Sequence, residues 1–464
     1  MKNLLLTTTA LATLFAGVAM GASVTNDALT VTLGGELETQ AGFRSQGAKY
    51  TKATAEGLNA QKQSGNASST VFKRGLTPGN DNVAFDTVTA IHATVKGKTE
   101  FGTLYGAQIG IQATNLSKLP AGQNGLDRTF LFVENEMGRV ELGSNDGVGG
   151  TMRIGADSIA RATGGIDGQW SNYVQLDTFQ DTGANPYTQP AVQSMNNFIT
   201  APTLLTTSNQ LSGALSTVVN EGDEKSRKIT YYTPEFNGFQ AGLSYTPDTR
   251  NSGQDYIDKL GQNVVNGITQ PGSEYTLPTA KNAIAGGISW SGNLDKDQAF
   301  KLSVVGETAT IKNNVRSSTK YKNVSGAIFG AQYAYQNFSV AGSWGTQGKS
   351  MYADTATSMK AGSFYTLGAA YVQGPVGSSL TWMKSTKNKN TLDLISLGLD
   401  YQVAPGLLPF AEVTYFKMKQ KNSYNNSQYD NQSDSSTKYV PATNVAAAYQ
   451  NSGTAFILGT KLKF

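Results

Sequence analysis

The sequence predicts an all-β fold: a transmembrane, antiparallel, up-and-down β-barrel of about sixteen strands. Three observations lead to this prediction. Apolar and polar side chains alternate in segments of about ten residues, short turns and long polar connections follow one another regularly, and the chain begins with a segment typical of export. The 464 residues include no cysteine, which excludes disulfides and thiolate metal ligands.

The alternation of apolar and polar side chains is clear from the first expected strand to the last. Leu29, Val31 and Leu33 share one face of the first, and Phe456 and Leu458 share one face of the last. Side chains that face lipid and side chains that face the lumen alternate in this way in a membrane barrel. The pattern predicts strands at residues 28–43, 86–96, 101–113, 128–134, 139–145, 227–234, 239–247, 282–291, 299–309, 324–335, 338–344, 363–373, 378–386, 391–402, 407–418 and 454–464.

The connections between these strands differ strongly in length. Short turns rich in Gly, Pro and Asn occupy 234–238, 336–337 and 403–406, where those residues tolerate the required backbone angles. Long polar segments occupy 246–281 and 419–453. Such long connections are unusual in a compact soluble domain but normal on the outer side of a membrane barrel. We therefore expect long external loops at one end of the barrel.

The N-terminus indicates export. Lys2 precedes a mostly apolar stretch over 4–20, and small residues follow at Gly21 and Ala22. These features predict a cleaved signal peptide over 1–22 and a single barrel domain over 23–464. The formal net charge of +4 is too small to indicate a nucleic-acid partner.

Aromatic residues concentrate near the ends of the expected strands. Amphipathic rings favour the headgroup level of a membrane, so this placement predicts aromatic girdles. The residues are Tyr231, Tyr232, Phe236, Phe239, Tyr245, Tyr333, Tyr335, Phe338, Trp344, Tyr415 and Phe416.

Three segments resemble the Gram-negative general porins. The chain ends in Phe464, with Leu462, Leu458 and Phe456 at alternate positions before it, which is similar to the C-terminal signal read by the barrel assembly machinery. The segments RKITYYTPEFNGFQAGLSY (227–245) and RTFLFVENEMGRVELGSNDG (128–147) resemble two porin hairpins. Where the family often has Leu-Gly-Arg-Gln at the end of the fifth strand, within the second of these segments, this chain has LGSN at 142–145.

The resemblance implies a function and an assembly. It implies a homotrimer in the outer membrane of a Gram-negative bacterium, in contact with lipid and lipopolysaccharide. Each barrel would be a water-filled channel for passive diffusion of small hydrophilic solutes and ions, with no cofactor. The resemblance also implies that the long segment after the fifth strand, at about 146–226, folds inward and narrows the channel. We call this segment the constriction loop.

Charged residues in the constriction loop are candidates for the narrowest part of the pore. The stretch over 151–164 predicts a short helix, with Arg153, Asp157 and Arg161 on one face at i, i+4 and i+8. Ile154 and Ile159 are expected to anchor it to the wall. The alternative is a solvated surface helix with ordinary ion pairs. Further carboxylates follow at Asp167, Asp177 and Asp181.

On the strands, charged residues are expected to face the lumen, because a charge on the lipid face near the membrane midplane costs about 2–4 kcal/mol. Arg139 and Glu141 share a face, opposite Val140 and Leu142. The same rule places Glu36, Glu38, Lys461 and Lys463 inward or beyond the lipid band. Arg44 and Arg128 lie near strand ends and are candidates for the pore mouth.

Two other functions stay open from the sequence. A substrate-selective or closed barrel with a role in adhesion is compatible with the Asn-, Ser- and Thr-rich segments 46–70 and 419–453. A barrel hydrolase needs a base of near-neutral pKa, and the single histidine, His92, is more typical of a polar strand residue. The sequence favours a non-enzymatic channel. Glu221, Asp223 and Glu224 form a hypothetical site for Ca²⁺ or for lipopolysaccharide-bound cations.

Overall fold

A computed structural model provides the structure of the chain. It describes residues 22–25, 29–50, 82–112, 126–174, 198–206, 226–249, 262–265, 268–271, 279–312, 320–352, 354, 360–420 and 449–464. Within these residues, no helix has the length and apolar character needed to cross a membrane.

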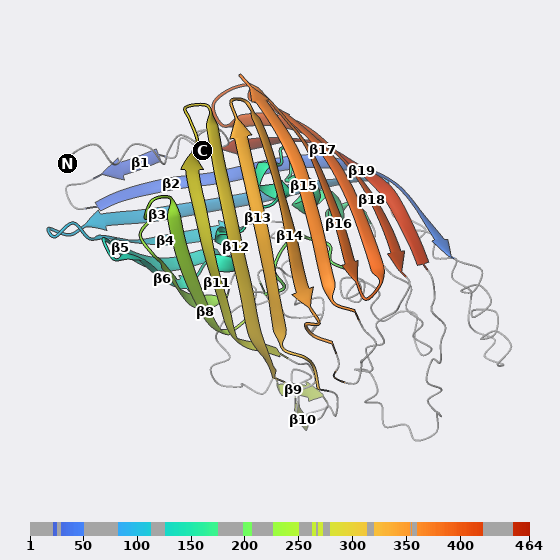
Figure 1. Ribbon diagram of the computed structural model, residues 1–464, viewed down its shortest axis with the longest axis horizontal. Helices are drawn as coiled ribbons and strands as arrows, with labels where there is room; N and C mark the ends of the chain where they lie inside the picture. Colours follow the sequence, from blue (N-terminus) through green and yellow to red (C-terminus); the bar gives the residue numbers. More distant parts are fainter. Residues whose placement is uncertain are drawn as a thin grey trace.

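Sixteen of the described strands form one closed antiparallel sheet (Figure 1). Each pairs with its neighbour in sequence, and the last pairs with the first. The strands are β2 (Leu29–Tyr50), β3 (Val83–Lys98), β4 (Leu104–Gln112), β5 (Leu126–Asn135), β6 (Gly138–Ser144), β7 (Arg227–Tyr232), β8 (Phe239–Asp248), β11 (Thr279–Asn293), β12 (Gln298–Lys312), β13 (Val324–Tyr335), β14 (Phe338–Gly348), β15 (Gly362–Gln373), β16 (Val376–Lys387), β17 (Asn390–Tyr401), β18 (Leu407–Gln420) and β19 (Tyr449–Lys463).

Each of the sixteen predicted segments overlaps one of these strands. The prediction of a sixteen-stranded barrel is therefore confirmed. Three short strands lie outside the ring. β1 (Ala22–Thr25) pairs with the start of β2, and β9 (Gln262–Val265) pairs with β10 (Ile268–Pro271). The boundary predicted for the signal peptide falls at the first described residue, and its cleavage stays a prediction.

Side-chain exposure follows the predicted two-residue period. Along β6, Val140 and Leu142 are exposed on the outside, while Glu141 between them is buried on the inside. The outer face of β15 likewise exposes Tyr365 and Leu367. The band of exposed apolar residues suits contact with lipid.

Exposed aromatic residues lie near both ends of the strands. Phe236, Phe239 and Tyr335 are exposed at the end with the short turns, and Tyr245 and Trp344 at the other. The prediction is wrong for two residues, which face inward. The Phe416 ring is fully buried, and the Tyr232 hydroxyl lies 2.7 Å from that of Thr151 in the constriction loop.

The seam between β2 and β19 closes the barrel. Lys461 pairs with Glu38 at 2.8 Å and Lys463 pairs with Glu36 at 3.3 Å, as expected for inward charges. The backbone of Phe464 exchanges two hydrogen bonds with Gly35, of 2.8 and 3.0 Å. The final residue is thus part of the closure. Its recognition by the assembly machinery stays a prediction.

Candidate functional site

The described part of the constriction loop lies inside the ring of strands, as Figure 1 shows for its short helical segments. These are α2 (Val148–Thr151), η2 (Ala156–Ile159), η3 (Gly165–Asp167) and η4 (Gln169–Asn172). α2 lies against β8, β11 and β12, η2 against β14 to β16, η3 against β16 to β18, and η4 against β19. The loop therefore follows the inner wall from β8 round to β19.

The predicted helix over 151–164 is wrong in form. A single 3₁₀ turn at Ala156–Ile159 stands there, preceded and followed by extended or turn backbone. The backbone N–H groups of Ser158 and Ala160 close this short turn, whereas two others donate to wall hydroxyls. That of Ala156 donates to Thr366 and that of Arg161 to Ser379. Polar partners on the wall thus replace the hydrogen bonds that a continuous helix makes.

Two carboxylates on neighbouring wall strands hold the turn at 161–165. Asp400 of β17 accepts from the Arg161 guanidinium at Nε (2.8 Å) and Nη2 (2.6 Å). Glu412 of β18 accepts from the backbone N–H groups of Thr163 (3.0 Å) and Gly165 (3.2 Å) and from the Thr163 hydroxyl (2.8 Å). Such charge-assisted hydrogen bonds fix the turn against the wall.

Residues 198–206, in the second half of the loop, are also hydrogen-bonded to the wall. Glu307 of β12 accepts from the backbone N–H groups of Leu205 (2.7 Å) and Thr206 (3.0 Å). The Ser385 hydroxyl donates to the Ile199 carbonyl at 2.7 Å. Both ends of the described loop are therefore bonded to the barrel.

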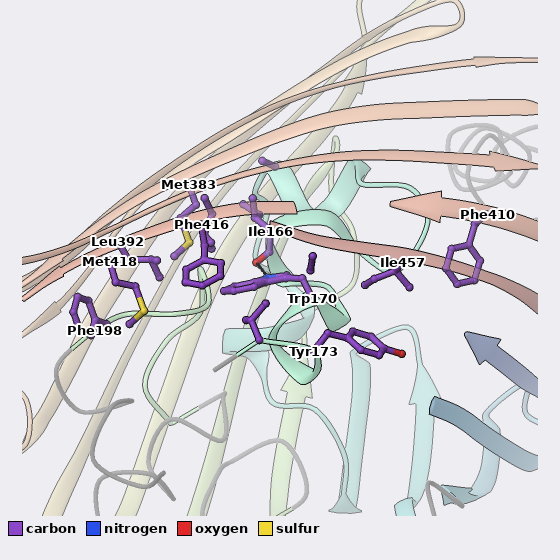
Figure 2. Close-up of a cluster of buried hydrophobic side chains, with 14 residues drawn as sticks. Ile166, Trp170, Tyr173, Phe198, Met383, Leu392, Phe410, Phe416, Met418 and Ile457 are labelled. Atoms are coloured by element: carbon purple, nitrogen blue, oxygen red, sulfur yellow. Dashed lines mark hydrogen bonds between the residues drawn. The ribbon is translucent and has the colours of Figure 1, made fainter. Parts of the chain in front are cut away.

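An apolar core inside the barrel also joins the loop to the wall. Trp170 is 1% exposed, and its ring centroid lies 5.8 Å from that of Phe416 on β18 (Figure 2). Its indole N–H donates to the Ile166 carbonyl at 3.2 Å. Met383, Leu392 and other wall residues belong to the same buried cluster. The inner face of β16 to β19 thus includes an apolar patch, which the loop covers.

Glycines on the inner wall allow the loop backbone to come close. A Cβ atom at Gly330 of β13 would overlap the carbonyl oxygen of Ile154. At Gly42 of β2 it would overlap the ring of Tyr173. A side chain at either position would occupy space that the loop uses.

Three of the predicted loop residues come together. Arg153 forms ion pairs with Asp157 at 2.9 Å and with Asp167 at 3.3 Å, and it donates to the Pro202 carbonyl at 2.8 Å. Burial alone would lower the pKa of the Arg153 guanidinium, but the two carboxylates outweigh it and raise that pKa. Arg161 does not join this group, because it pairs with Asp400. Ile159 is buried against Ala341 and Ala370, as expected for an anchor.

The predicted wall residues form separate groups. Arg139 pairs with Glu141 at 2.6 Å and with Glu134 at 3.1 Å, and its guanidinium lies 4.2 Å from the centre of the Phe132 ring. Arg128 pairs with Asp146 at 2.9 Å. Arg44 lies on the inner face of β2, where its backbone N–H donates to Asn82. These residues lie on or next to β2, β5 and β6 and do not converge on one point.

The sequence prediction missed Asp400, Glu412 and Glu307. A weak signal was present, because each stands on the inner face of its strand among mostly apolar or small side chains. Asp177, Asp181 and the carboxylates Glu221, Asp223 and Glu224 lie outside the described residues.

Replacing Glu412 by Ala is expected to loosen the turn at 161–165. The N–H groups of Thr163 and Gly165 lose their acceptor, at about 1–3 kcal/mol for each buried group. The Glu412→Gln variant is the matched control. Both N–H groups bond to one carboxylate oxygen, so an amide oxygen can replace it. Urea unfolding should show a clear loss for Glu412→Ala and a small one for Glu412→Gln, and equal losses would contradict the assigned role of these bonds.

Comparisons with known proteins agree with this architecture. The model of the Gram-negative porin family matches residues 7–423. An uncharacterized protein of Rickettsia felis is 31% identical over 429 residues, which cover 85% of this chain and 88% of that protein. One of Rickettsia typhi is 30% identical over 432 residues, with the same coverage.

Among solved structures, the anion-selective porin from Comamonas acidovorans superposes with a TM-score of 0.50 at 14% identity, covering 94% of this chain and 100% of that one. At this identity the likeness concerns the fold. The assignment of the chain to a family rests on the match of the family's sequence model over residues 7–423. The chain therefore belongs to the Gram-negative porin family, whose barrel forms an outer-membrane channel for the passive diffusion of small hydrophilic solutes.

Proposed function

We propose that solutes cross the barrel on the side of β3 and β4, past a constriction formed by the loop. The observation that carries this proposal is the difference in exposure between the two halves of the inner wall. Asp86, Ala90, His92 and Lys96 on the inner face of β3 are all partly or fully exposed. The inner residues of β16 are instead buried beneath the loop.

In this proposal the loop residues Arg153, Asp157 and Asp167 form one edge of the constriction. Arg161 holds the loop in place through Asp400. Arg139 and Glu141 line the wall near the short-turn end, and Arg44 and Arg128 lie toward the mouth at the other end. Fixed charges at a narrow, rigid passage determine which ions and solutes enter it.

The assembly follows from the family. We propose that the chain is exported and that residues 1–22 are removed. The barrel assembly machinery then recognises the C-terminal residues Phe456, Leu458, Leu462 and Phe464. The folded protein forms a homotrimer in contact with outer-membrane lipid and lipopolysaccharide. The exposed Phe456, Leu458 and Leu462 support an outward-facing signal. The family and fold are those of non-enzymatic channels, so we assign no catalytic role to His92.

Conductance in a planar lipid bilayer tests the proposed function. The folded protein should insert in steps and conduct in proportion to salt concentration, because passage is passive. Heat-denatured protein, recognised by its altered mobility on a gel, is the control and should not insert. Liposome swelling with sugars of increasing size then gives the exclusion limit.

Absence of conductance steps from folded protein would overturn the proposal of an open channel and favour a closed barrel. Saturation with one solute would instead favour a substrate-selective pore.

A further inference from the structure

We propose that the constriction loop has a second role: residues 163–173, the loop tip, fasten the first and last strands of the barrel to each other from inside. These strands are β2 and β19, and their pairing is the seam at which the barrel closes. The role does not depend on whether the channel is open, so the inference goes beyond the proposed function.

The seam differs from every other strand pairing in the ring. Among the sixteen strands of the ring, neighbours follow one another along the chain, except β2 and β19, which come from its opposite ends. The entropy cost of bringing two segments together grows with the length of chain between them, so connectivity helps the seam least. The seam therefore depends on contacts between its two strands and on whatever packs across them.

The loop tip is attached to β19. Trp170 and Tyr173 belong to one buried cluster with Ala455 and Ile457 of this strand, and Figure 2 shows Ile457 above Tyr173. The side chain of Ile457 is completely buried. The η4 turn, which carries Trp170, lies against the same strand. An apolar contact thus joins the loop tip to the last strand of the ring.

The same few loop residues also contact β2. The Gln40 side-chain amide donates to the side-chain oxygen of Gln169. The Tyr173 ring occupies the space that a side chain at Gly42 would need. Gly42 lies directly opposite Ile457 across the seam. The loop tip therefore contacts both strands at one level of the barrel and bridges them from inside.

The ring of Tyr173, and not its hydroxyl, provides the contact with β2. The side chain is 6% exposed, and its hydroxyl has no hydrogen-bond partner among the residues that the structure describes. Separation of the strands would expose this apolar surface to water, which opposes opening. Tyr173→Phe should therefore behave like the native protein, whereas Tyr173→Ala should weaken the seam.

Amide hydrogen exchange in the folded barrel tests the proposal, because it reports local opening strand by strand. In Tyr173→Ala, exchange of the β2 and β19 amides should become about tenfold faster, since truncation of a buried aromatic ring removes contacts that oppose opening. Ile159→Ala is the matched control. Ile159 anchors the loop to Ala341 of β14 and Ala370 of β15, away from the seam. Any faster exchange in this variant should be confined to β14 and β15.

A disulfide across the seam provides a second measurement. The chain has no cysteine, and Thr39 and Thr460 lie directly opposite each other with exposed side chains. The Cα atoms of such a pair are about 4.5–5.5 Å apart, which a disulfide can span. Oxidised Thr39→Cys/Thr460→Cys should restore native resistance to urea in Tyr173→Ala. An oxidised Val340→Cys/Ala369→Cys pair, which joins β14 to β15, should not.

The outcomes separate the claims. Equal acceleration of exchange in all strands, or native exchange at the seam of a folded Tyr173→Ala barrel, would overturn the role of the loop tip. Equal rescue by the two disulfides would also overturn it, because it would indicate a general gain in stability. If Tyr173→Ala does not fold, the oxidised seam disulfide should restore folding, and failure to do so would contradict the proposal. Absence of conductance would count only against the proposed channel.

Discussion

Replacement of Trp170 by Ala is expected to release the constriction loop from the wall and to give a larger, noisier channel. The Trp170 ring is 1% exposed and packs against Phe416 (Figure 2). Truncation of a buried Trp to Ala typically costs about 3–5 kcal/mol, because a cavity remains where the ring was. Here the loss affects the attachment of the loop, since the strands keep their own hydrogen bonds.

Single-channel recording and unfolding in urea together check this prediction. Trp170→Ala should conduct more than the native protein, with greater current noise, and should unfold at lower urea concentration. Trp344→Ala is the matched control, because Trp344 lies on the outer face of β14 and is 38% exposed. It should insert and conduct like the native channel. Native conductance in a folded Trp170→Ala channel would show that the apolar core does not hold the loop.

The strands were predictable because their signal is local. Alternation of side chains determines which face meets lipid, and short turns determine the register of each hairpin. The segment 324–335 was predicted with the same bounds as β13. β2 extends to Tyr50, beyond the predicted end at residue 43, because its pairing with β19 continues there. Pairing between distant segments carries no such local signal.

The inward course of the loop came from family resemblance, and its contacts could not be predicted. Helical spacing predicted that Arg153 and Asp157 lie close together, and they do although that helix does not form, whereas Arg161 pairs with Asp400, 239 residues away. The sequence of β17 contains one local indication that something covers the inner wall. Leu392 and Leu394 face inward and Ile395 and Leu397 face outward, so the strand is apolar on both faces. A wall that faced only water inside would not need this pattern.

Inner-wall glycines explain why the loop lies so close to the strands. The backbone of Ile154 passes directly over Gly330, and that of Arg161 passes over Gly398. At Gly368 an added Cβ would lie 3.0 Å from that of Ala156 in η2. Gly in a strand lacks a side chain to pack and weakens the strand, and here the approaching backbone takes the space. The close approach of the loop to the wall therefore requires glycine at these positions, because a side chain there would occupy the space of the loop backbone.

Gly330→Ala should therefore push the loop toward the lumen and narrow the pore. The added Cβ would overlap the Ile154 carbonyl oxygen, which is backbone and cannot rotate away. Either the loop moves inward or β13 bends. Overpacking of this kind typically costs about 1–3 kcal/mol. Because Arg153 lies next to Ile154, inward movement also shifts its ion pairs into the passage. We expect lower conductance and a smaller exclusion limit in liposome swelling.

Gly286→Ala is the matched control for this change. Gly286 lies on β11, and an added Cβ there would lie 3.7 Å or more from its nearest neighbours, which is ordinary contact. Both variants insert one methyl group into a barrel strand, so a general effect on strand propensity would appear in both. Reduced conductance in Gly330→Ala alone, with native gel mobility in both, would show that contact with the loop sets the width of the pore. Native conductance in a folded Gly330→Ala channel would mean that the passage does not depend on how closely the loop approaches β13.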